Sequence, residues 1–328
     1  MNEFMSQIVL PIPGRFGIKA APAVRLAAAG SSTVECQVIH EDVLTIEIEG
    51  VGSYALMWTP TEDNRQAVGY TVKDGVLADA GVPESLALGA GFAFTEGIVN
   101  QLGDIAYMSV CPERPDVVRM RLINPDGVSV LRRNVIMNSS CGICGGREQI
   151  QSGLAATRRV GDTLRMSMGN FEAIRNTMHL HQDIFGSTGG AHGATVFNAS
   201  IKSVAVAEDL GRHNALDKVI GYCFLSGENL SGCGVFVTSR ISYEMVAKSA
   251  RAGFEVIAAI SAPSSLAIEM ADSFGITLCG FVRDDSVKVY THSHRIVPHT
   301  AGTNRSDSVG NLAQVEKATK VDCESIRY

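Results

Sequence analysis

Long apolar runs are missing from this sequence: no uninterrupted stretch approaches the roughly 20 residues that a membrane-spanning helix needs. We expect no secretory segment either, because the opening residues carry Glu3 and prolines at positions 11 and 13 break the first apolar run. With eight cysteines in 328 residues, the chain also has too few for a disulfide scaffold. We therefore expect a soluble protein of the reducing cytoplasm with no membrane partner.

Basic residues are outnumbered as well. The chain has 28 lysines and arginines against 34 aspartates and glutamates, a formal net charge of -6. A general nucleic-acid-binding protein needs a dense basic surface to meet the phosphate backbone, so we expect no nucleic-acid partner. Hydrophobic residues make up 45% of the chain, which is enough to bury a substantial core.

The first part of the chain is predicted to be rich in strands. Residues 1–40 show no clear period, and we expect an irregular leader with at most one short strand. A strand-rich domain is predicted for residues 41–137. It contains alternating apolar residues in three segments and a helix opened by Pro83. The strand segments are 43–48, 54–58 and 118–122, the helix spans 83–94, and a turn at 124–127 leads into a returning strand at 128–137.

The second part, residues 147–298, has the pattern of an α/β domain. Short, wholly apolar strands alternate there with helical segments, which indicates a mostly parallel sheet covered by helices on both faces. Residues 287–290 are predicted to add an antiparallel edge strand, and residues 299–328 to form a polar tail. The predicted strands are 195–197, 204–206, 233–238, 256–260 and 277–282, and the helices are 171–186, 214–225, 242–253 and 264–275.

Two cysteines, Cys141 and Cys144, lie in a run with almost no side-chain bulk, residues 138–146. The glycines and the serine pair of this run disfavour both helix and strand, so we predict a mobile loop that exposes sulfur. Such a pair can be half of a zinc site, a redox dithiol, a persulfide carrier or two buried thiols. A helix-capping redox pair is disfavoured, because Gly145 and Gly146 begin a helix poorly.

A zinc site would need further ligands, since structural zinc takes four. The sequence has no second Cys-x-x-Cys pair, which leaves His179, His181 or scattered cysteines. We predict no resident metal. The other six cysteines are expected to be small buried or incidental thiols, namely Cys36, Cys111, Cys223, Cys233, Cys279 and Cys323.

Arginines follow several predicted strands of the second part. In open α/β sheets, ligands bind beyond the carboxyl ends of the strands, where helix N-termini attract phosphate. Arg212, Arg240 and Arg283 would share that edge, which predicts a ligand with several phosphates. His213 beside Arg212 is either a phosphate donor or a structural loop histidine.

Carboxylates follow the same strands. One of them would accept hydrogen bonds from the ring N–H and the amino group of a guanine, a pair of donors that adenine lacks on one edge. The candidates are Asp209, Asp284 and Asp285.

These segments together carry a family resemblance. From Leu86–Gly97 to Tyr290 the chain resembles the formate dehydrogenase accessory sulfurtransferase family, FdhD. The matching motifs are Cys141–Gly145, Thr188–His192, Glu208–Lys218, Ser239–Met245, Ser261–Ala267 and Gly280–Arg283.

The resemblance implies a sulfurtransferase that takes persulfide sulfur from a cysteine desulfurase. The acceptor would be the molybdenum or tungsten bis-molybdopterin guanine dinucleotide cofactor that formate dehydrogenase requires, bound as cargo through its GDP-like ends. Cys141 would carry the persulfide and Cys144 would assist it. The implied cofactor-binding segment is Phe281, Val282, Arg283, Asp284, Asp285 and Ser286, and our own reading of the strand ends adds Arg212, His213 and Arg240.

The resemblance also implies a homodimer and a three-layer α-β-α core like that of cytidine deaminase. Deaminase chemistry is not implied, because it needs a His-x-Glu motif, whereas His192 is followed by Gly193 and Ala194. Two alternatives remain open. They are a zinc-binding protein and a nucleotide-binding chaperone that protects the cofactor without transferring sulfur.

Overall fold

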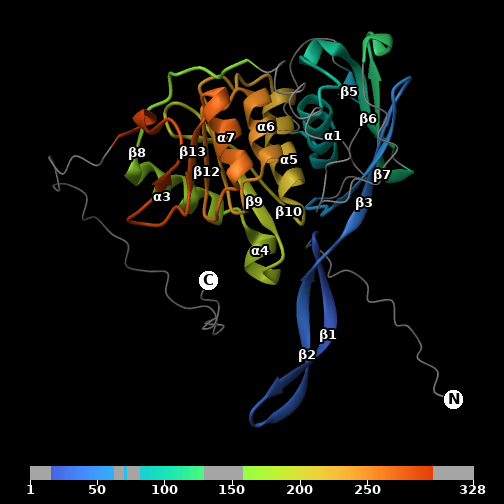
Figure 1. Ribbon diagram of the computed structural model, residues 1–328. Helices are drawn as coiled ribbons and strands as arrows, with labels where there is room; N and C mark the ends of the chain where they lie inside the picture. The colour runs from blue at the N-terminus through green and yellow to red at the C-terminus, as the bar shows by residue number, and fades with distance from the viewer. Residues whose placement is uncertain (1–15, 63–69, 72–81, 112, 129–157, 298–328) are drawn as a thin grey trace, which may run out of the picture. The chain divides into compact units, whose positions relative to one another are not determined.

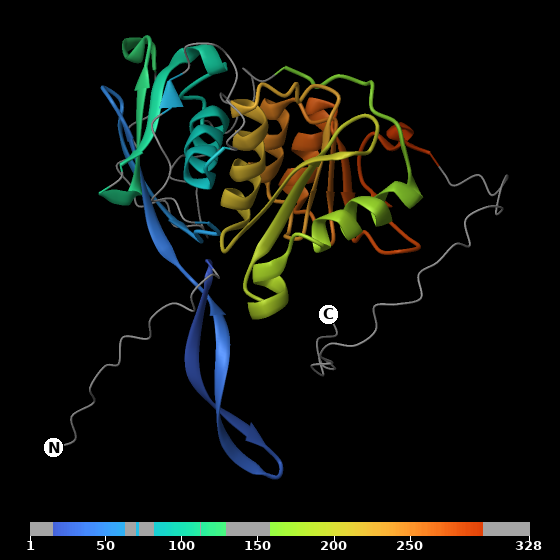
Figure 2. The same cartoon turned by 180° about the vertical axis from the view of Figure 1, so that it is seen from behind.

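The computed structural model describes residues 16–62, 70–71, 82–111, 113–128 and 158–297, shown from opposite sides in Figures 1 and 2. All of these residues belong to one compact unit, Met1–Pro298. The predicted leader up to residue 15, the strand at 129–137, the cysteine loop at 138–146 and the tail at 299–328 lie outside the described residues. The predicted domain boundary at residue 147 lies outside them as well.

A five-stranded sheet forms from the alternating segments of the first part, in the order β4-β3-β7-β6-β5. Strands β3 and β7 are parallel, and the other neighbours are antiparallel. Leu44, Ile46 and Ile48 of β3 are buried, as their period of two predicts. The strands are β3 (Asp42–Ile48), β4 (Gly52–Trp58), β5 (Tyr70–Thr71), β6 (Ile105–Cys111) and β7 (Arg114–Leu122), and short 3-10 turns lie at Leu102–Asp104 and Pro125–Gly127.

Helix α1 (Glu84–Thr95) covers this sheet and also packs against helix α5 (Arg212–Leu225) of the second part. The two helix backbones touch at a pair of glycines. A Cβ on Gly91 would lie 1.9 Å from the carbonyl oxygen of Asp217, and one on Gly221 would lie 1.8 Å from that of Ala87. Only glycine allows this approach, so these residues couple the two parts of the chain.

The second part contains a six-stranded sheet in the order β10-β9-β11-β12-β13-β14. Its strands are β9 (His192–Phe197), β10 (Ser203–Asp209), β11 (Gly234–Val237), β12 (Val256–Ala259), β13 (Thr277–Gly280) and β14 (Lys288–Val289). The helices are α5, α6 (Tyr243–Ala252), α7 (Ser265–Phe274), α3 (Met168–His179) and α4 (Asp183–Thr188). A two-stranded parallel pair, β8 (Met166–Ser167) with β15 (Ile296–Val297), lies beside them, and Ser293–Arg295 forms a 3-10 turn.

Helices cover both faces of this sheet. Helices α5, α6 and α7 lie in front of the strands in Figure 1, and α3 lies in front of them in Figure 2. Residues of one strand alternate between the two faces: Val235 and Val237 pack with the first group of helices, and Phe236 packs with α3. The predicted three layers of helix, sheet and helix are therefore present. The likeness to cytidine deaminase stays a prediction.

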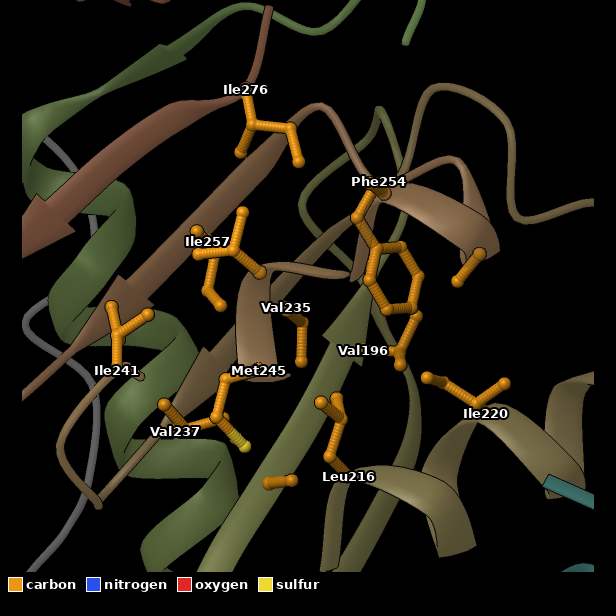
Figure 3. Close-up of a cluster of buried hydrophobic side chains, with 14 of the residues drawn as sticks. Val196, Leu216, Ile220, Val235, Val237, Ile241, Met245, Phe254, Ile257 and Ile276 are labelled. Carbon is orange, nitrogen blue, oxygen red and sulfur yellow. The ribbon is translucent and has the colours of Figure 1, made fainter. Parts of the chain in front are cut away.

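The largest core lies between the sheet and the first group of helices. Figure 3 shows strand residues meeting helix residues there without a polar side chain among the labelled ones. The residues labelled are Val196, Leu216, Ile220, Val235, Val237, Ile241, Met245, Phe254, Ile257 and Ile276, all fully or almost fully buried.

The sheet contains both parallel and antiparallel neighbours, so our prediction of a mostly parallel sheet is wrong. Within this sheet, only β11–β12 and β12–β13 are parallel pairs among the described strands. The edge strand β14 is antiparallel, as predicted, and β9 runs antiparallel to both of its neighbours because a tight connection joins it to β10. Strands β10, β11, β12 and β13 nevertheless run in the same direction, and their carboxyl ends share one edge.

The prediction of an irregular leader is also wrong for the described residues before position 40. They form a hairpin of β1 (Ile18–Ala27) and β2 (Gly30–Ile39), which pair only with each other. Most side chains of the hairpin are exposed. The hairpin therefore lacks the alternation of buried and exposed residues from which we predicted strands elsewhere, so the sequence pattern did not reveal it.

Candidate functional site

The carboxyl edge of the six-stranded sheet gathers three helix N-termini. Helix α5 follows β10 with Gly211 as its N-cap, α6 follows β11 with Ser242, and α7 follows β12 with Ser264. The Ser264 hydroxyl accepts a hydrogen bond from the amide of Ala267, whereas the Ser242 hydroxyl is buried without a partner in the described part of the chain. Free amides and helix dipoles make this edge attractive to anions.

Two arginines add positive charge at this edge. Arg212 is the first residue of α5, and Arg240 follows β11. Burial lowers the pKa of the Arg212 guanidinium, and the positive charge of Arg240 lowers it further. The Nε atom of Arg212 is buried and has no hydrogen-bond partner among the described residues. A bound anion would relieve both the repulsion and the missing hydrogen bond.

His192 lies beside these arginines at the start of β9. Burial lowers the pKa of its imidazole first, and the positive charges of Arg212 and Arg240 lower it further. The ring is therefore neutral at pH 7, so it can accept or donate a hydrogen bond without adding charge. His192 was not among the predicted site residues, and its proximity to Arg212 and Arg240 adds it to the candidate site.

His213 has a partner that the sequence did not suggest. Its Nε2 atom lies 3.0 Å from a carboxylate oxygen of Glu244, in the first turn of α6. Hydrogen bonding to this histidine lowers the pKa of the Glu244 carboxyl. The pair links the N-termini of α5 and α6, and an acidic residue in the first turn of a helix was its only sequence signal.

The segment Phe281–Ser286 follows β13 at the same edge. Phe281 has a φ of 51°, in the left-handed region that side chains rarely adopt. The ammonium of Lys288 lies 4.5 Å from the centre of its ring. Phe281 directly follows the core strand β13, and its neighbour Val282 is buried.

The rest of this segment is tied down by polar contacts. The Arg283 guanidinium donates to the carbonyl oxygen of Ile260, 2.8 Å away at the end of β12. Its amide donates to the carbonyl oxygen of Ser286. Asp284 forms an ion pair with Arg175 of α3, and the Ser286 hydroxyl donates to Asp285.

The predicted arginines thus divide into two groups. Arg212, His213 and Arg240 come together with His192 and Glu244 around the ends of β10 and β11. Arg283 belongs to the end of β13, two strands beyond β11, and neighbouring strands are separated by about 4.8 Å. A ligand that reaches both groups must be extended along the edge.

Of the three carboxylates considered for guanine recognition, Asp209 is excluded. Its side chain is fully buried, and both carboxylate oxygens are occupied by donors of the protein itself. One oxygen lies 2.7 Å from the Lys218 ammonium and accepts from the amide of Thr59. The other accepts from the amide of Gly211 and from Asn214. Asp209 therefore stabilises the loop before α5 through its hydrogen bonds to Gly211 and Asn214.

Cys141 and Cys144 lie outside the described residues, as do Cys323 and the side chain of Cys111. Cys223, Cys233 and Cys279 are buried, which confirms the prediction for these three, and burial raises the pKa of Cys223 to about 12. Cys36 is exposed. In the described ranges, no group of three or more histidines, cysteines or carboxylates is placed to hold a metal ion. No described helix is long and apolar enough to cross a membrane.

Comparison with known proteins shows which family this chain belongs to. The model of the FdhD/NarQ family matches residues 81–297, a range that contains both the cysteine pair and the edge described above. This chain belongs to the FdhD/NarQ family. The match also covers the helix α1 that couples the two parts of the fold.

Relatives within the FdhD/NarQ family match over most of their length. The sulfur carrier protein FdhD of Thermoplasma acidophilum is 36% identical over 234 residues, which are 70% of this chain and 82% of that protein. The sulfur carrier protein FdhD of Streptomyces avermitilis is 34% identical over 281 residues, covering 85% of this chain and 95% of the relative.

A solved structure shares the fold. The crystal structure of a protein from Desulfotalea psychrophila, described as a candidate formate dehydrogenase accessory protein, superposes with a TM-score of 0.65. It covers 85% of this chain and 99% of its own, at 22% sequence identity.

Proposed function

We propose that this protein is a cytoplasmic sulfurtransferase that receives persulfide sulfur from a cysteine desulfurase. It passes the sulfur to the molybdenum or tungsten bis-molybdopterin guanine dinucleotide cofactor destined for formate dehydrogenase. The observation that supports this most directly is the presence of Cys141 and Cys144 within the range matched by the FdhD/NarQ family, whose relatives above are named sulfur carriers. By family resemblance, the working unit is a homodimer.

Sulfur uptake needs a single nucleophilic sulfur on this chain. The thiolate of Cys141 attacks the outer sulfur of the donor persulfide, so a new S–S bond forms on Cys141 and the inner sulfur of the donor leaves as a thiolate. Cys144 is then placed by sequence to attack the inner sulfur of Cys141. That attack would release the terminal sulfur as hydrosulfide and leave a Cys141–Cys144 disulfide, which a cellular thiol reduces before the next cycle.

The cofactor is cargo, and its nucleotide ends carry phosphates that suit the arginine-bearing edge. Arg212 and Arg240 stand next to two helix N-termini, and the Arg212 Nε lacks a partner in the described part of the chain. The side chain of Phe281 is partly exposed at the same edge, where its ring contacts Lys288. We therefore assign the diphosphate to the Arg212 group and a ring of the cargo to the segment Phe281–Ser286.

Mass spectrometry of the full-length protein after incubation with a desulfurase and cysteine tests the carrier role. We expect one cysteine peptide, that of residues 141–144, to gain the mass of one sulfur atom, and dithiothreitol to remove it. An unmodified loop together with stoichiometric zinc in the purified protein would instead support the zinc alternative.

Replacing Arg240 with alanine tests the cargo site. Loss of one charge-assisted hydrogen bond to phosphate is expected to weaken binding of GDP about tenfold to a hundredfold in calorimetry, because such bonds contribute roughly 1.5–3 kcal/mol. Arg114→Ala is the matched control, since this exposed arginine pairs with Asp116 on β7 of the other sheet. Equal GDP affinity in Arg240→Ala and the unmodified protein would place the nucleotide elsewhere.

A further inference from the structure

The β1–β2 hairpin has no strand partner among the described residues. The two strands form a sheet of their own, and both views show them as a separate two-stranded ribbon. Large apolar side chains of this hairpin are exposed to solvent: Val24 is 65% exposed, Leu26 79% and Val38 40%. Because an isolated hairpin is at best marginally stable in water, this ribbon is expected to gain stability from a further strand.

Only the base of the hairpin is anchored. Ile18 and Ile39, the first and last residues of the ribbon, pack with Ile184 of α4 and with Ala191. Beyond this small cluster, the remaining residues of both strands are exposed or only partly buried. The ladder between β1 and β2 is regular over its whole length, so the ribbon offers continuous outer edges.

The two outer edges differ in their capacity to accept another strand. Bonded and non-bonded pairs alternate along an antiparallel ladder, starting from the bonded pair that closes a two-residue loop, here Ala27 and Gly30. Counting from that pair, Pro22 opposite Glu35 is a non-bonded position, so the proline nitrogen faces away from β2. The outer edge of β1 therefore lacks a donor, whereas β2 has no proline.

The side chains of β2 match those of a second, antiparallel copy of β2 when the two-fold axis passes through one particular residue. If two copies of β2 run antiparallel around a two-fold axis at Cys36, Val34 of one copy faces Val38 of the other, and the two Cys36 residues face each other. The same alternation makes the Cys36 pair non-bonded, because its backbone groups point toward β1. Glu35 and Gln37 then point their backbone groups at the partner and form bonded pairs.

The charge of Glu35 favours this alignment of the two β2 strands. Glu35 is the only charged residue of β2, and in this register it meets Gln37 of the other copy. Moving the axis by one residue to Glu35 would set two carboxylates directly opposite each other, which is unfavourable. Moving it to Val34 would face Cys36 with Ser32 and Val38 with Gly30, so the apolar matches would be lost.

We propose that two copies of this chain associate through their β2 edges, with the two-fold axis at Cys36, to form a continuous four-stranded sheet β1-β2-β2-β1. The interface is isologous, as two-fold symmetry requires. This proposal specifies the dimer of the proposed function and rests on that part of it alone. Sulfur transfer by Cys141 neither requires the register nor follows from it.

Cross-linking through Cys36 tests the register. In a non-bonded antiparallel pair the Cα atoms are about 4.5 Å apart, within the range that a disulfide spans. Mild oxidation of the full-length protein with diamide is expected to give a covalent dimer whose linked peptides both contain Cys36. Cys36→Ser should abolish this cross-link and remain dimeric in light scattering. A dimer in solution without a Cys36 cross-link would overturn the register.

A charge variant tests the interface in the absence of oxidation. Gln37→Glu places two like-charged pairs across the two-fold axis, and we expect the dimer dissociation constant to rise about tenfold in analytical ultracentrifugation. Adding Glu35→Lys to that variant restores opposite charges and should restore the dimer. Both residues are exposed in the ribbon, so the fold is expected to persist. If Gln37→Glu dimerises like the unmodified protein, the β2 edge is not the interface, and persulfide formation would be unaffected by that result.

Discussion

Replacing Cys141 with alanine is expected to abolish activation of formate dehydrogenase while GDP binding is unchanged. In the proposed mechanism, the sulfur atom of this residue forms the S–S bond that receives the donor sulfur. Among the described cysteines, Cys36 is exposed, and Cys223, Cys233 and Cys279 are buried. Activation is measured in lysate lacking the endogenous protein, with desulfurase added, and GDP binding by calorimetry. The expected loss is the whole of the activity above background.

Two control variants separate the carrier from the other cysteines. Cys36→Ala removes an exposed thiol and should leave activation unchanged. Cys144→Ala should still accept sulfur on Cys141 but release it more slowly, so the adduct accumulates. Undiminished activation by Cys141→Ala, with nucleotide binding intact, would favour the chaperone that protects the cofactor without sulfur chemistry.

Local signals in the sequence were enough to place most elements of the core. Alternation in β3 and β4, and the caps of α6 and α7, depend on contacts within a few residues. Ser242 and Gly253 bound α6, and Gly253 adopts the left-handed conformation that ends a helix. For these strands and helices, whose determinants are local, the predictions were confirmed.

Elements whose partners lie far away in the sequence were harder to predict. Strand β6 contains Tyr107 in an exposed position and pairs with β7 through two irregularities in register, so its period is weak. The reversed direction of β9 depends on which neighbour it pairs with, and a run of apolar residues is the same in either direction. Periodicity identifies a buried strand without giving its orientation.

The candidate site shows the same division. The arginines at strand ends were predictable, because the alternation of strands and helices fixes one edge for all of them. Glu244 was missed, since it approaches His213 only when α6 packs beside α5. Asp209 was misassigned because its burial depends on Lys218, a residue of α5 whose side chain reaches back beneath the loop.

Lys218 is the centre of a buried ionic cluster that joins both parts of the fold. Its ammonium, fully buried, lies 2.7 Å from Asp209 of β10 and 2.5 Å from Glu84 of α1, and it donates to the carbonyl oxygens of Thr59 and Glu208. Burial alone would lower the pKa of Lys218, but the two carboxylates outweigh it and raise the pKa. The lysine is therefore charged in the folded protein.

Lys218→Met is expected to destabilise the protein by about 3–5 kcal/mol, because two buried carboxylates lose their shared cation. Urea unfolding measures the loss. Lys202→Met, at an exposed position, should change the free energy of unfolding by no more than about 0.5 kcal/mol. Adding Glu84→Gln to Lys218→Met should recover part of the loss, since one unpaired charge is removed.

The deficit of Lys218→Met is also expected to depend on pH. Burial raises the pKa of the Glu84 carboxyl, and removing the ammonium takes away the main opposing influence. A carboxyl whose pKa is higher in the folded state binds protons more tightly there than in the unfolded chain. Burying it therefore lowers the free energy of unfolding less in acid and more as the pH rises. The gap between variant and unmodified protein should therefore widen from pH 5 to pH 8. A gap that narrows over this range would show that Lys218 does not compensate the charge of Glu84.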